Sequence, residues 1–563
     1  AGKEGSPGLF VPVADEIEDA GELPMQQGPE RVAAGDVCAA LAAVFAGDEC
    51  ELAWIGHDTK RLHACLGERD LALPPAAFDS EIAAFLLDPA AARDLPAIAQ
   101  QRFGTRIQSF EELAGRGAKA TPVEAIEVEA LARFAAAQAA AVRDLRAPLV
   151  EQLERDGLTA LFEQVEMPLT AVLGRVERNG VRIDEATLRA LSEEYEAKLA
   201  TIEARIHELA GETFSVNSPK QLQEILFEKL KLPVVKKTKT GYSTDESVLE
   251  QLSFEHELPA QVLAWRRLSK LKSTYLDALP PLVSPRSGRI HPTFLQTGAA
   301  TGRLASTNPN VQNIPIRTEE GIRIREAFVP AEGRLLLSAD YSQVELRILA
   351  HYSGDESLIE AFEQGEDIHR RTAAEVAGID PEDVTADQRA RAKAVNFGII
   401  YGSSAFGLAN QLGIATGEAQ ATIDAYFARY QGVRRFLDET IEGAKERGYV
   451  TTLLGRRRYL PDLASRNRVL RQAAERMAVN TVIQGSEADL IKRAMVELDA
   501  AIDDEGLGAL LILQVHDELV FEVPEDEAER LTRLARERMR GVHRLRVPLE
   551  VDVGLGRSWR EAH

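Results

Sequence analysis

Hydrophobic residues recur with a helical period over long parts of the chain. Between residues 160 and 212, Leu188, Leu191, Tyr195 and Leu199 are spaced three or four positions apart, with Glu and Arg between them. This spacing places the apolar side chains on one face and predicts amphipathic helices. Ala-rich helices are predicted over 36–46 and 125–145, and Ser218-Pro219 is a typical helix start.

Shorter apolar runs predict strands. RLLLSA at 334–339 ends at Asp340 and is followed by a helix-like stretch, SQVELRILAHY. Residues 509–523 predict two apolar strands that meet at a polar tip, His516-Asp517-Glu518. A further short strand is predicted in ELAWIGHD, at 51–58.

Composition describes a large acidic chain with enough apolar residues for several cores. It has 563 residues, 45% hydrophobic and 28% charged, and a net charge of −23. That length predicts about three to five domains. The charge excludes a globally basic nucleic-acid coat but leaves room for a local basic cleft. Residues 215–240 hold six Lys against two Glu, and 456–476 hold seven Arg against two acids. Either stretch could be a solvated face or a surface that follows phosphates.

Other classes are excluded by what the sequence lacks. Cys38, Cys50 and Cys65 form no CxxC pair, which argues against a disulfide framework or a cysteine-rich zinc site and fits a reducing compartment. No apolar run reaches about 18 residues, so no membrane span is predicted. The sequence begins AGKEGSPG, without Met or a signal-peptide pattern, and we expect it to be a piece of a longer protein.

Two patterns could carry chemistry. Asp340 and Asp517 each end an apolar run and could meet on a pair of Mg²⁺ ions, which prefer oxygen ligands and promote in-line phosphoryl displacement. Each could equally well just end a strand. In 388–402, Arg389, Lys393 and Phe397 are four apart and Tyr401 continues the row. Such a face suits a nucleotide, but it also suits an ordinary packed helix, and spacing alone leaves both interpretations open.

Longer motifs resemble a known family. SADYSQVELRILAHYS, QRARAKAVNFGIIYG and LQVHDELVFEVP resemble motifs A, B and C of family A DNA polymerases, in that order. TGRLASTNPNVQNIPIR, ERMAVNTVIQGSEADLIKRAM, NSPKQLQ and LGRRRYLPD match as well, and the resemblance runs from about residue 160 to the C-terminus. Several long motifs in order are far more specific than one short pattern.

The resemblance implies an α+β multidomain fold shaped like a right hand. It has a palm with an antiparallel sheet, a helical thumb, helical fingers, and an incomplete N-terminal domain of the RNase H-like exonuclease type. The expected boundaries are 1–155 for the exonuclease-like domain, 156–285 for the thumb with the start of the palm, 286–350 for the palm with motif A, 351–478 for the fingers with motif B, and 479–563 for the palm with motif C.

Residue roles follow from the same resemblance. Asp340, Asp517 and the backbone carbonyl of Tyr341 are expected to bind two Mg²⁺ ions, with Mn²⁺ as a substitute and Glu518 as an auxiliary carboxylate. Arg389 and Lys393 are expected to hold the triphosphate, and Lys393 to protonate the leaving pyrophosphate. The other nucleotide-contacting positions are Phe397 and Tyr401 at the sugar and base, Glu345 as the steric gate, His369 and Gln343.

The expected DNA contacts include two readers of the minor groove, Arg303 and Gln484. Hydrogen-bond acceptors occur there on every base pair, so such side chains can test pair shape without reading sequence. Phosphate contacts from the basic stretches would give a salt-dependent grip. The remaining expected contacts are Arg476, Asn480, Asn310, Gln312, His516 near the primer end, and Lys220 in the thumb.

The expected function is template-directed addition of dNTPs to a primer 3′-hydroxyl, in repair and replication gap filling. The expected partners are primer–template DNA and dNTPs, with no membrane, and the expected form is a monomer in the bacterial cytoplasm, associated with the nucleoid. A single-subunit RNA polymerase is an alternative, against which Glu345 and Phe397 argue. A silent DNA-binding scaffold is another, against which the intact carboxylates and cations argue.

The N-terminal region departs from the family pattern. FVPVADEIEDAGE, IGHDTKRLHACLG and FDSEIAAFLLDP resemble parts of the 3′–5′ exonuclease domain, but its first acidic strand would precede residue 1. Arg61 stands where an Asp is expected, and RFAAAQAAAV at 133–142 has no carboxylate. We therefore expect no proofreading, and no 5′-nuclease domain within this chain.

Overall fold

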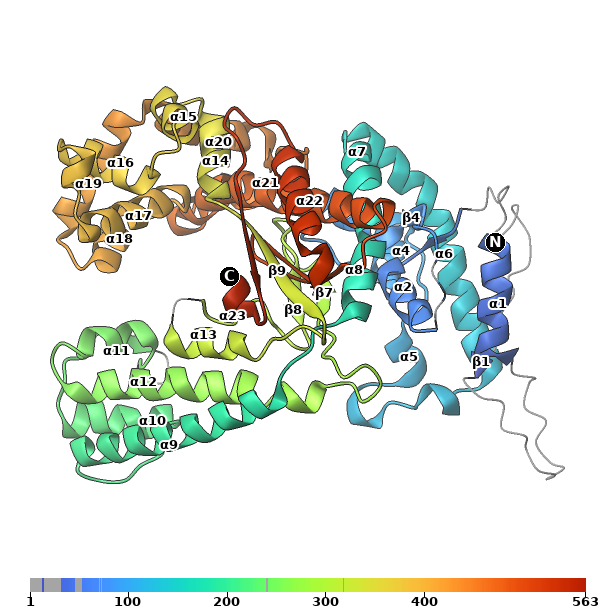
Figure 1. Ribbon diagram of the computed structural model, residues 1–563, viewed down its shortest axis with the longest axis horizontal. Helices are drawn as coiled ribbons and strands as arrows, with labels where there is room; N and C mark the ends of the chain where they lie inside the picture. Colours follow the sequence, from blue (N-terminus) through green and yellow to red (C-terminus); the bar gives the residue numbers. More distant parts are fainter. Residues whose placement is uncertain are drawn as a thin grey trace.

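A computed structural model describes residues 13–14, 32–45, 53–69, 71, 73–238, 241–316 and 318–563. Most of FVPVADEIEDAGE therefore lies outside the described residues. The described chain has a central sheet, two helical lobes on one side of it, and a further domain at the N-terminal end (Figure 1). No helix in these ranges is long and apolar enough to cross a membrane.

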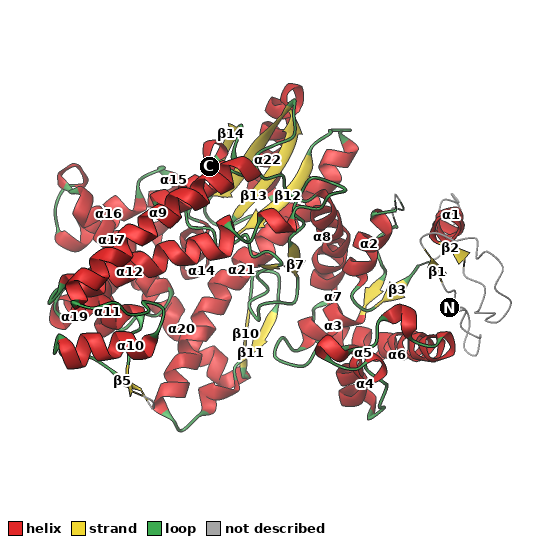
Figure 2. Cartoon of the chain, turned by 90° about the horizontal axis from the view of Figure 1, so that it is seen from below, coloured by secondary structure: helices red, strands yellow, loops and turns green. Residues whose placement is uncertain are grey.

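The central sheet has four antiparallel strands in the order β12-β13-β9-β14. The two predicted apolar runs supply three of them, and a C-terminal segment pairs with the free edge of β9. Leu336, Leu337 and Phe521 are fully buried, as expected for strands covered by helices. Figure 2 shows helix α22 lying along this sheet. The bounds are β9 Arg334–Tyr341, β12 Leu510–Val515, β13 Glu518–Pro524, β14 Val551–Gly556, α21 Arg468–Asp504, α22 Ala528–Gly541 and α23 Trp559–Ala562.

One lobe is built from the predicted amphipathic helices. Leu188, Leu191 and Tyr195 are buried on one face of α9, as their spacing predicted. The Ser218 hydroxyl accepts a hydrogen bond from the Gln221 amide and caps α10. The helical stretch is not continuous, because it stops at Gly180 (φ 58°) and Val181 forms a β-bridge with Ile290. The helices of this lobe are α9 Glu185–Ala210, α10 Pro219–Gln223, α11 Glu246–Leu252 and α12 Glu257–Leu271, with α13 Glu319–Glu326 beside them. The preceding helices, α7 Thr159–Leu161 and α8 Met167–Asn179, lie outside the lobe, towards the N-terminal domain (Figure 1).

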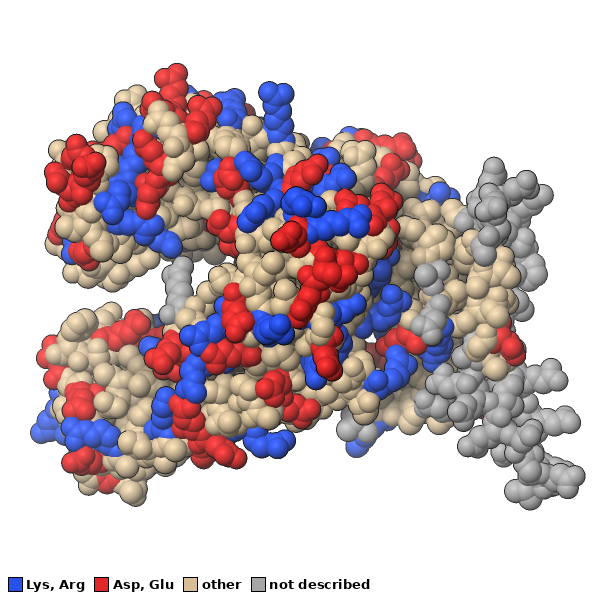
Figure 3. Space-filling model, viewed as in Figure 1, with Lys and Arg blue, Asp and Glu red and all other residues tan. Residues whose placement is uncertain are grey.

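The second lobe is also helical, and Figure 3 shows a hollow between the two lobes. Its helix α17 covers most of the predicted 388–402 helix and is capped by Thr385 in a capping box with Gln388. Tyr401 follows the last helical residue. The elements are α14 Val344–Ser353, α15 Glu356–Glu363, α16 Ile368–Ala377, α17 Ala386–Ile400, α18 Ala405–Leu412, α19 Thr416–Arg429, α20 Gln431–Arg447, β10 Tyr449–Thr451 and β11 Arg457–Tyr459.

The N-terminal domain has its own apolar core, which includes Phe78, Leu145 and Leu149. Both predicted Ala-rich helices are present, and the predicted strand at 51–58 is reduced to β3, which pairs in parallel with β4. The bounds are α1 Ala34–Phe45, β3 Ile55–Gly56, α2 Thr59–Gly67, β4 Phe78–Asp79, α3 Ser80–Leu87, α4 Leu95–Phe103, α5 Phe110–Ala114 and α6 Val128–Arg155.

A buried ionic cluster joins three distant parts of the chain. Glu166, which precedes α8, pairs with Arg456 from the β10–β11 hairpin and lies 2.8 Å from the Lys492 ammonium of α21. Arg456 also pairs with Asp489 of α21, 2.8 Å away. All four side chains are at most 1% exposed. The two cations and two anions give the cluster no net charge, and their pairing offsets the cost of removing the four charges from water.

Candidate functional site

Asp340 and Asp517 come together at one end of the central sheet. Asp340 lies near the end of β9 and is paired in register with Glu518 of β13 and Asp552 of β14. Asp517 lies in the turn between β12 and β13, and its carbonyl accepts a hydrogen bond from the Tyr341 amide at 3.2 Å. The two aspartates are 177 residues apart in sequence and adjacent in the fold.

The electrostatics of this pair favour a bound cation. Burial, together with the charges of Asp517 and Glu518, raises the pKa of Asp340 to about 8. Burial also raises the pKa of Asp517 to about 6. A bound cation would reduce the repulsion between two such carboxylates and stabilise their charged forms. Within the described ranges, no three His, Cys, Asp or Glu side chains are grouped as a ready-made metal site.

The Glu518 side chain lies in a buried polar cluster. Its Oε1 accepts hydrogen bonds from the Ser338 hydroxyl at 2.7 Å and the Trp559 indole at 2.8 Å. The Arg325 guanidinium lies 3.7 Å from Oε2 and stacks 3.8 Å from the Trp559 ring centroid. Burial opposes the charge of Glu518, but hydrogen bonds from His563 and Ser338 outweigh it and lower its pKa. Glu518 is thus held as a carboxylate by residues that no sequence motif indicated.

The row on α17 leads away from these carboxylates. Tyr401, just after the helix, donates a hydrogen bond to Glu345 at 3.0 Å, and Glu345 is close enough to Asp517 to raise its pKa further. The Phe397 and Tyr401 rings stack with centroids 6.3 Å apart. Lys393 and Arg389 follow one and two turns further along the same face.

Two residues of this region have partners that the sequence did not indicate. The Arg389 guanidinium pairs with Asp367, the N-cap of α16, at 2.6 Å. His369 is buried, with its ring 3.0 Å from the Asn396 amide and 5.9 Å from the Phe397 ring. Burial, and then the charge of Lys393, lower the pKa of His369 to about 4. His369 is therefore neutral at pH 7 and lies close to Lys393 and Phe397.

Arg303 is clamped between two carboxylates. Its Nη2 donates to Glu345 at 2.7 Å and also to Glu487 of α21. Glu345 of α14 thus bridges Arg303 and Tyr401. Glu487 was not among the predicted site residues.

The predicted DNA-contacting residues fall into two groups. Arg476, Asn480 and Gln484 are spaced four apart on α21 and share one face, and the Asn480 Oδ1 is buried without a hydrogen-bond partner. The others are spread over loops, caps and a short helix. Gln312 accepts a hydrogen bond from the Ser306 amide and donates one to Gln514, and Gln343 is the N-cap of α14. The exposed members are Asn310, His516 in the β12–β13 turn and Lys220 in α10.

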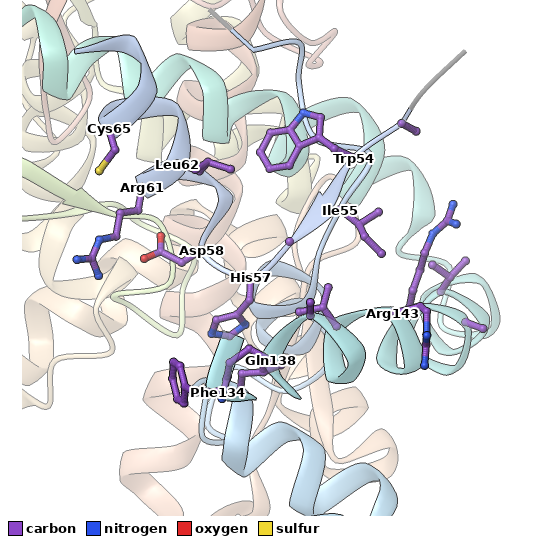
Figure 4. A pocket seen from close by; sticks show the side chains of 18 of the residues that line it. Trp54, Ile55, His57, Asp58, Arg61, Leu62, Cys65, Phe134, Gln138 and Arg143 are labelled. Atoms are coloured by element: carbon purple, nitrogen blue, oxygen red, sulfur yellow. The ribbon is translucent and has the colours of Figure 1, made fainter. Parts of the chain in front are cut away.

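A cavity of about 1570 Å³ lies in the N-terminal domain, between α6 and the β3–α2 segment. His57, at the end of β3, lies beside Phe134 and Gln138 of α6 (Figure 4). Asp58 and Arg61 line the same cavity, and burial raises the pKa of Asp58 to about 6. Arg61, which stands where the family pattern has an Asp, therefore lines this cavity.

A sheet with paired carboxylates, set between two helical lobes, is the arrangement of hand-shaped polymerases. A model of DNA polymerase family A matches residues 185–561, and a model of the ribonuclease H-like domain of DNA polymerase I matches residues 44–145. The chain belongs to family A of the DNA polymerases. The expected family and fold class are thereby confirmed.

Individual relatives agree. The chain is 48% identical to DNA polymerase I of Geobacillus stearothermophilus and 49% identical to that of Pseudomonas aeruginosa, over 91% and 88% of its length. It covers 59% and 54% of those two proteins, so it spans less than two thirds of the relatives it matches. A solved structure of the polymerase domain of Pol1 from M. smegmatis, in complex with DNA primer-template and dNTP, matches with a TM-score of 0.86 and 42% identity, over 93% of this chain and 88% of that one.

Proposed function

We propose that this chain extends the 3′-hydroxyl of a DNA primer with dNTPs, as directed by a template strand. The observation that carries the proposal is the meeting of Asp340 and Asp517 beside Glu345, from which the face of Tyr401, Phe397, Lys393 and Arg389 extends. The relatives and the M. smegmatis complex support the same reaction class.

In this proposal the cations of α17 bind the triphosphate. Arg389 offers a fork of donors and Lys393 a mobile charge, which suits a phosphate chain. Arg389 pairs with Asp367, so a nucleotide would take the place of that partner. The primer 3′-oxygen bonds to the α-phosphorus and loses its proton to solvent, while the bond from the α-phosphorus to the bridging oxygen breaks and Lys393 protonates the leaving pyrophosphate.

The carboxylates fit divalent metal ions. Asp340 and Asp517 are hard oxygen donors whose mutual repulsion a cation relieves, and the Tyr341 carbonyl is adjacent in the chain. Two bound Mg²⁺ ions, or Mn²⁺ in their place, would supply charge stabilisation at the attacking and leaving oxygens. Glu518 supports the site from within its hydrogen-bonded cluster.

Sugar and base pair are tested by neighbouring residues. Glu345, fixed by Tyr401 and Arg303, fills the space that a 2′-hydroxyl would need. Phe397 and Tyr401 border the nucleotide, and His369, whose ring lies 5.9 Å from that of Phe397, is a further nucleotide contact. Arg303, Gln484 and the other predicted DNA contacts hold the primer–template, mostly without reading its sequence.

We further infer that the chain works as a monomer in the bacterial cytoplasm, on DNA of the nucleoid, in repair and gap filling. It lacks 3′–5′ proofreading in this proposal, because Arg61 and the carboxylate-free 133–142 segment do not supply the acids that an exonuclease site needs. Incubating the purified chain with Mg²⁺ and single-stranded DNA tests this point, and trimming from the 3′ end would contradict it.

Primer extension tests the central proposal. With Mg²⁺ and dNTPs, the chain should extend a matched primer, and Asp340→Asn and Asp517→Asn should each lower the rate by about 10³-fold while DNA binding is retained. Asp438→Asn is a matched control, because that exposed carboxylate pairs only with Arg434 among the interactions described on α20. Extension at normal rates by either site variant would overturn the assignment, and preference for rNTPs would favour an RNA polymerase.

A further inference from the structure

Glu487 is a buried carboxylate beside the candidate site that none of the expected roles uses. It lies on α21, one turn after Gln484, and its side chain is 4% exposed. Its ion-pair partner is Arg303, the expected minor-groove reader. Burial raises the pKa of Glu487 to about 8, although the Arg303 charge opposes the rise.

The backbone of Arg303 is fixed against the same helix. Gly302 (φ 88°) packs so closely on Arg456 that an added Cβ would lie 2.5 Å from its Nε. Gly485 of α21 also lies close to this segment, since a Cβ there would be 3.0 Å from the Thr301 carbonyl oxygen. This close packing restrains the main chain next to Arg303.

The Arg303 guanidinium donates to two carboxyl groups, which differ in whether they have another hydrogen-bond partner. Glu345 has a second hydrogen bond, from Tyr401, so it keeps a partner if Arg303 leaves. Glu487 has Arg303 as its described ion-pair partner, and a carboxyl group left buried without its hydrogen-bond partner is destabilised. The Arg303–Glu487 pair should therefore persist when DNA and nucleotide bind, and the contact with Glu345 should be the one exchanged.

We propose that Glu487 is a positioning residue that keeps the Arg303 guanidinium directed at the primer terminus, and that it thereby strengthens discrimination between matched and mismatched primer ends. Arg303 uses Nη2 for both carboxylates, and because its side chain is 34% exposed, Nη1 is left for the DNA. A guanidinium held at one corner has fewer orientations, so it can distinguish acceptors that are correctly placed from those that are shifted. This inference rests on the proposed function.

A binding experiment without divalent metal separates this inference from catalysis. Affinities for primer–templates with a matched or a mismatched 3′ end are measured by fluorescence anisotropy in EDTA. The proteins are the unaltered chain, Glu487→Ala, Glu487→Gln, Arg303→Ala and the Arg303→Ala/Glu487→Ala double variant. Glu497→Ala is the matched control, since Glu497 lies on the same helix and pairs with Arg493 at 2.8 Å.

Glu487→Ala is expected to lower the matched-to-mismatched affinity ratio by about threefold to tenfold. Glu487→Gln, which keeps an acceptor for Arg303, should retain most of the ratio, and Glu497→Ala all of it. In the Arg303→Ala background, Glu487→Ala should change the ratio by less than about twofold, because it acts through Arg303.

An unchanged ratio in Glu487→Ala, or an equal further loss in the Arg303→Ala background, would overturn the inference. A uniform loss of affinity for both primer ends would also overturn it, since that indicates a merely structural role. If Glu487→Ala does not fold, the same cycle is run with the near-isosteric Glu487→Gln, which must show the same non-additivity at smaller amplitude. Failure of the unaltered chain to extend a matched primer with Mg²⁺ would instead contradict the proposed function.

Discussion

Replacing Asp340 by Asn should slow primer extension by about 10³-fold and yet stabilise the metal-free protein. In the folded chain the pKa of Asp340 is raised from 3.8 to about 8. Between these pH values the folded chain keeps a proton on Asp340 that the unfolded chain has lost. The contribution of Asp340 to the stability of the metal-free chain is therefore fully present below about pH 4 and is lost as the pH rises towards 8. Asn carries no charge, and the variant escapes that loss.

The size of the effect follows from the same numbers. A rise from 3.8 to about 8 corresponds, taken alone, to about 6 kcal/mol. Because the carboxylate is partly solvated and shares its repulsion with Asp517, we expect a gain of about 1–2 kcal/mol at pH 8. In a chain of this size that is a rise in Tm of about 1–3 °C.

Thermal unfolding in EDTA at pH 5 and pH 8 measures this gain, with Asp438→Asn as the control. The gain should be smaller at pH 5, and adding Mg²⁺ at pH 8 should stabilise the unaltered chain more than the variant. A variant that is less stable than the unaltered chain at pH 8 without metal, or a gain that is equal at both pH values, would refute the reasoning.

Three further substitutions have defined outcomes. Glu345→Ala removes the proposed gate and should lower the preference for dNTPs over rNTPs by about 10–100-fold in single-nucleotide incorporation; an unchanged preference would contradict the gate. Phe397→Tyr should raise dideoxynucleotide incorporation by about tenfold, because a phenol can replace the missing 3′-hydroxyl as a hydrogen-bonding group, and chain-termination assays would show if it does not. Trp559→Phe removes the donor to Glu518 and should cost about 1 kcal/mol in denaturant unfolding, with a smaller loss of extension than Asp340→Asn; no change in either would argue against a supporting role for this cluster.

Local patterns predicted the frame of the site. The apolar runs before Asp340 and around Asp517 became neighbouring strands, and the four-residue spacing from Arg389 to Tyr401 became one face of α17 and its end. Both patterns depend on secondary-structure periods, which are written in a few adjacent residues. The resemblance to family A supplied the rest of the expected fold, including the RNase H-like domain.

The partners of the charged groups were beyond sequence reasoning. Glu518 and Glu522 are four apart and share one face of β13, where a sequence pattern suggests solvent. Both are buried because Arg325 and Arg289, from distant segments, lie beside them. The pairing of Arg303 with Glu487 likewise joins residues that only the tertiary fold brings together.

The ionic cluster around Glu166 sets a limit on how far the molecule can be shortened. Glu166 lies just beyond the N-terminal domain, yet it supplies half of the negative charge that Arg456 and Lys492 face in the interior. A truncated chain that begins after this glutamate would leave two buried cations with Asp489 as the remaining anion of the cluster. Arg456, one of these cations, packs against Gly302 in the loop that carries Arg303. A minimal enzyme should therefore keep the segment before α8, even if every upstream helix is discarded.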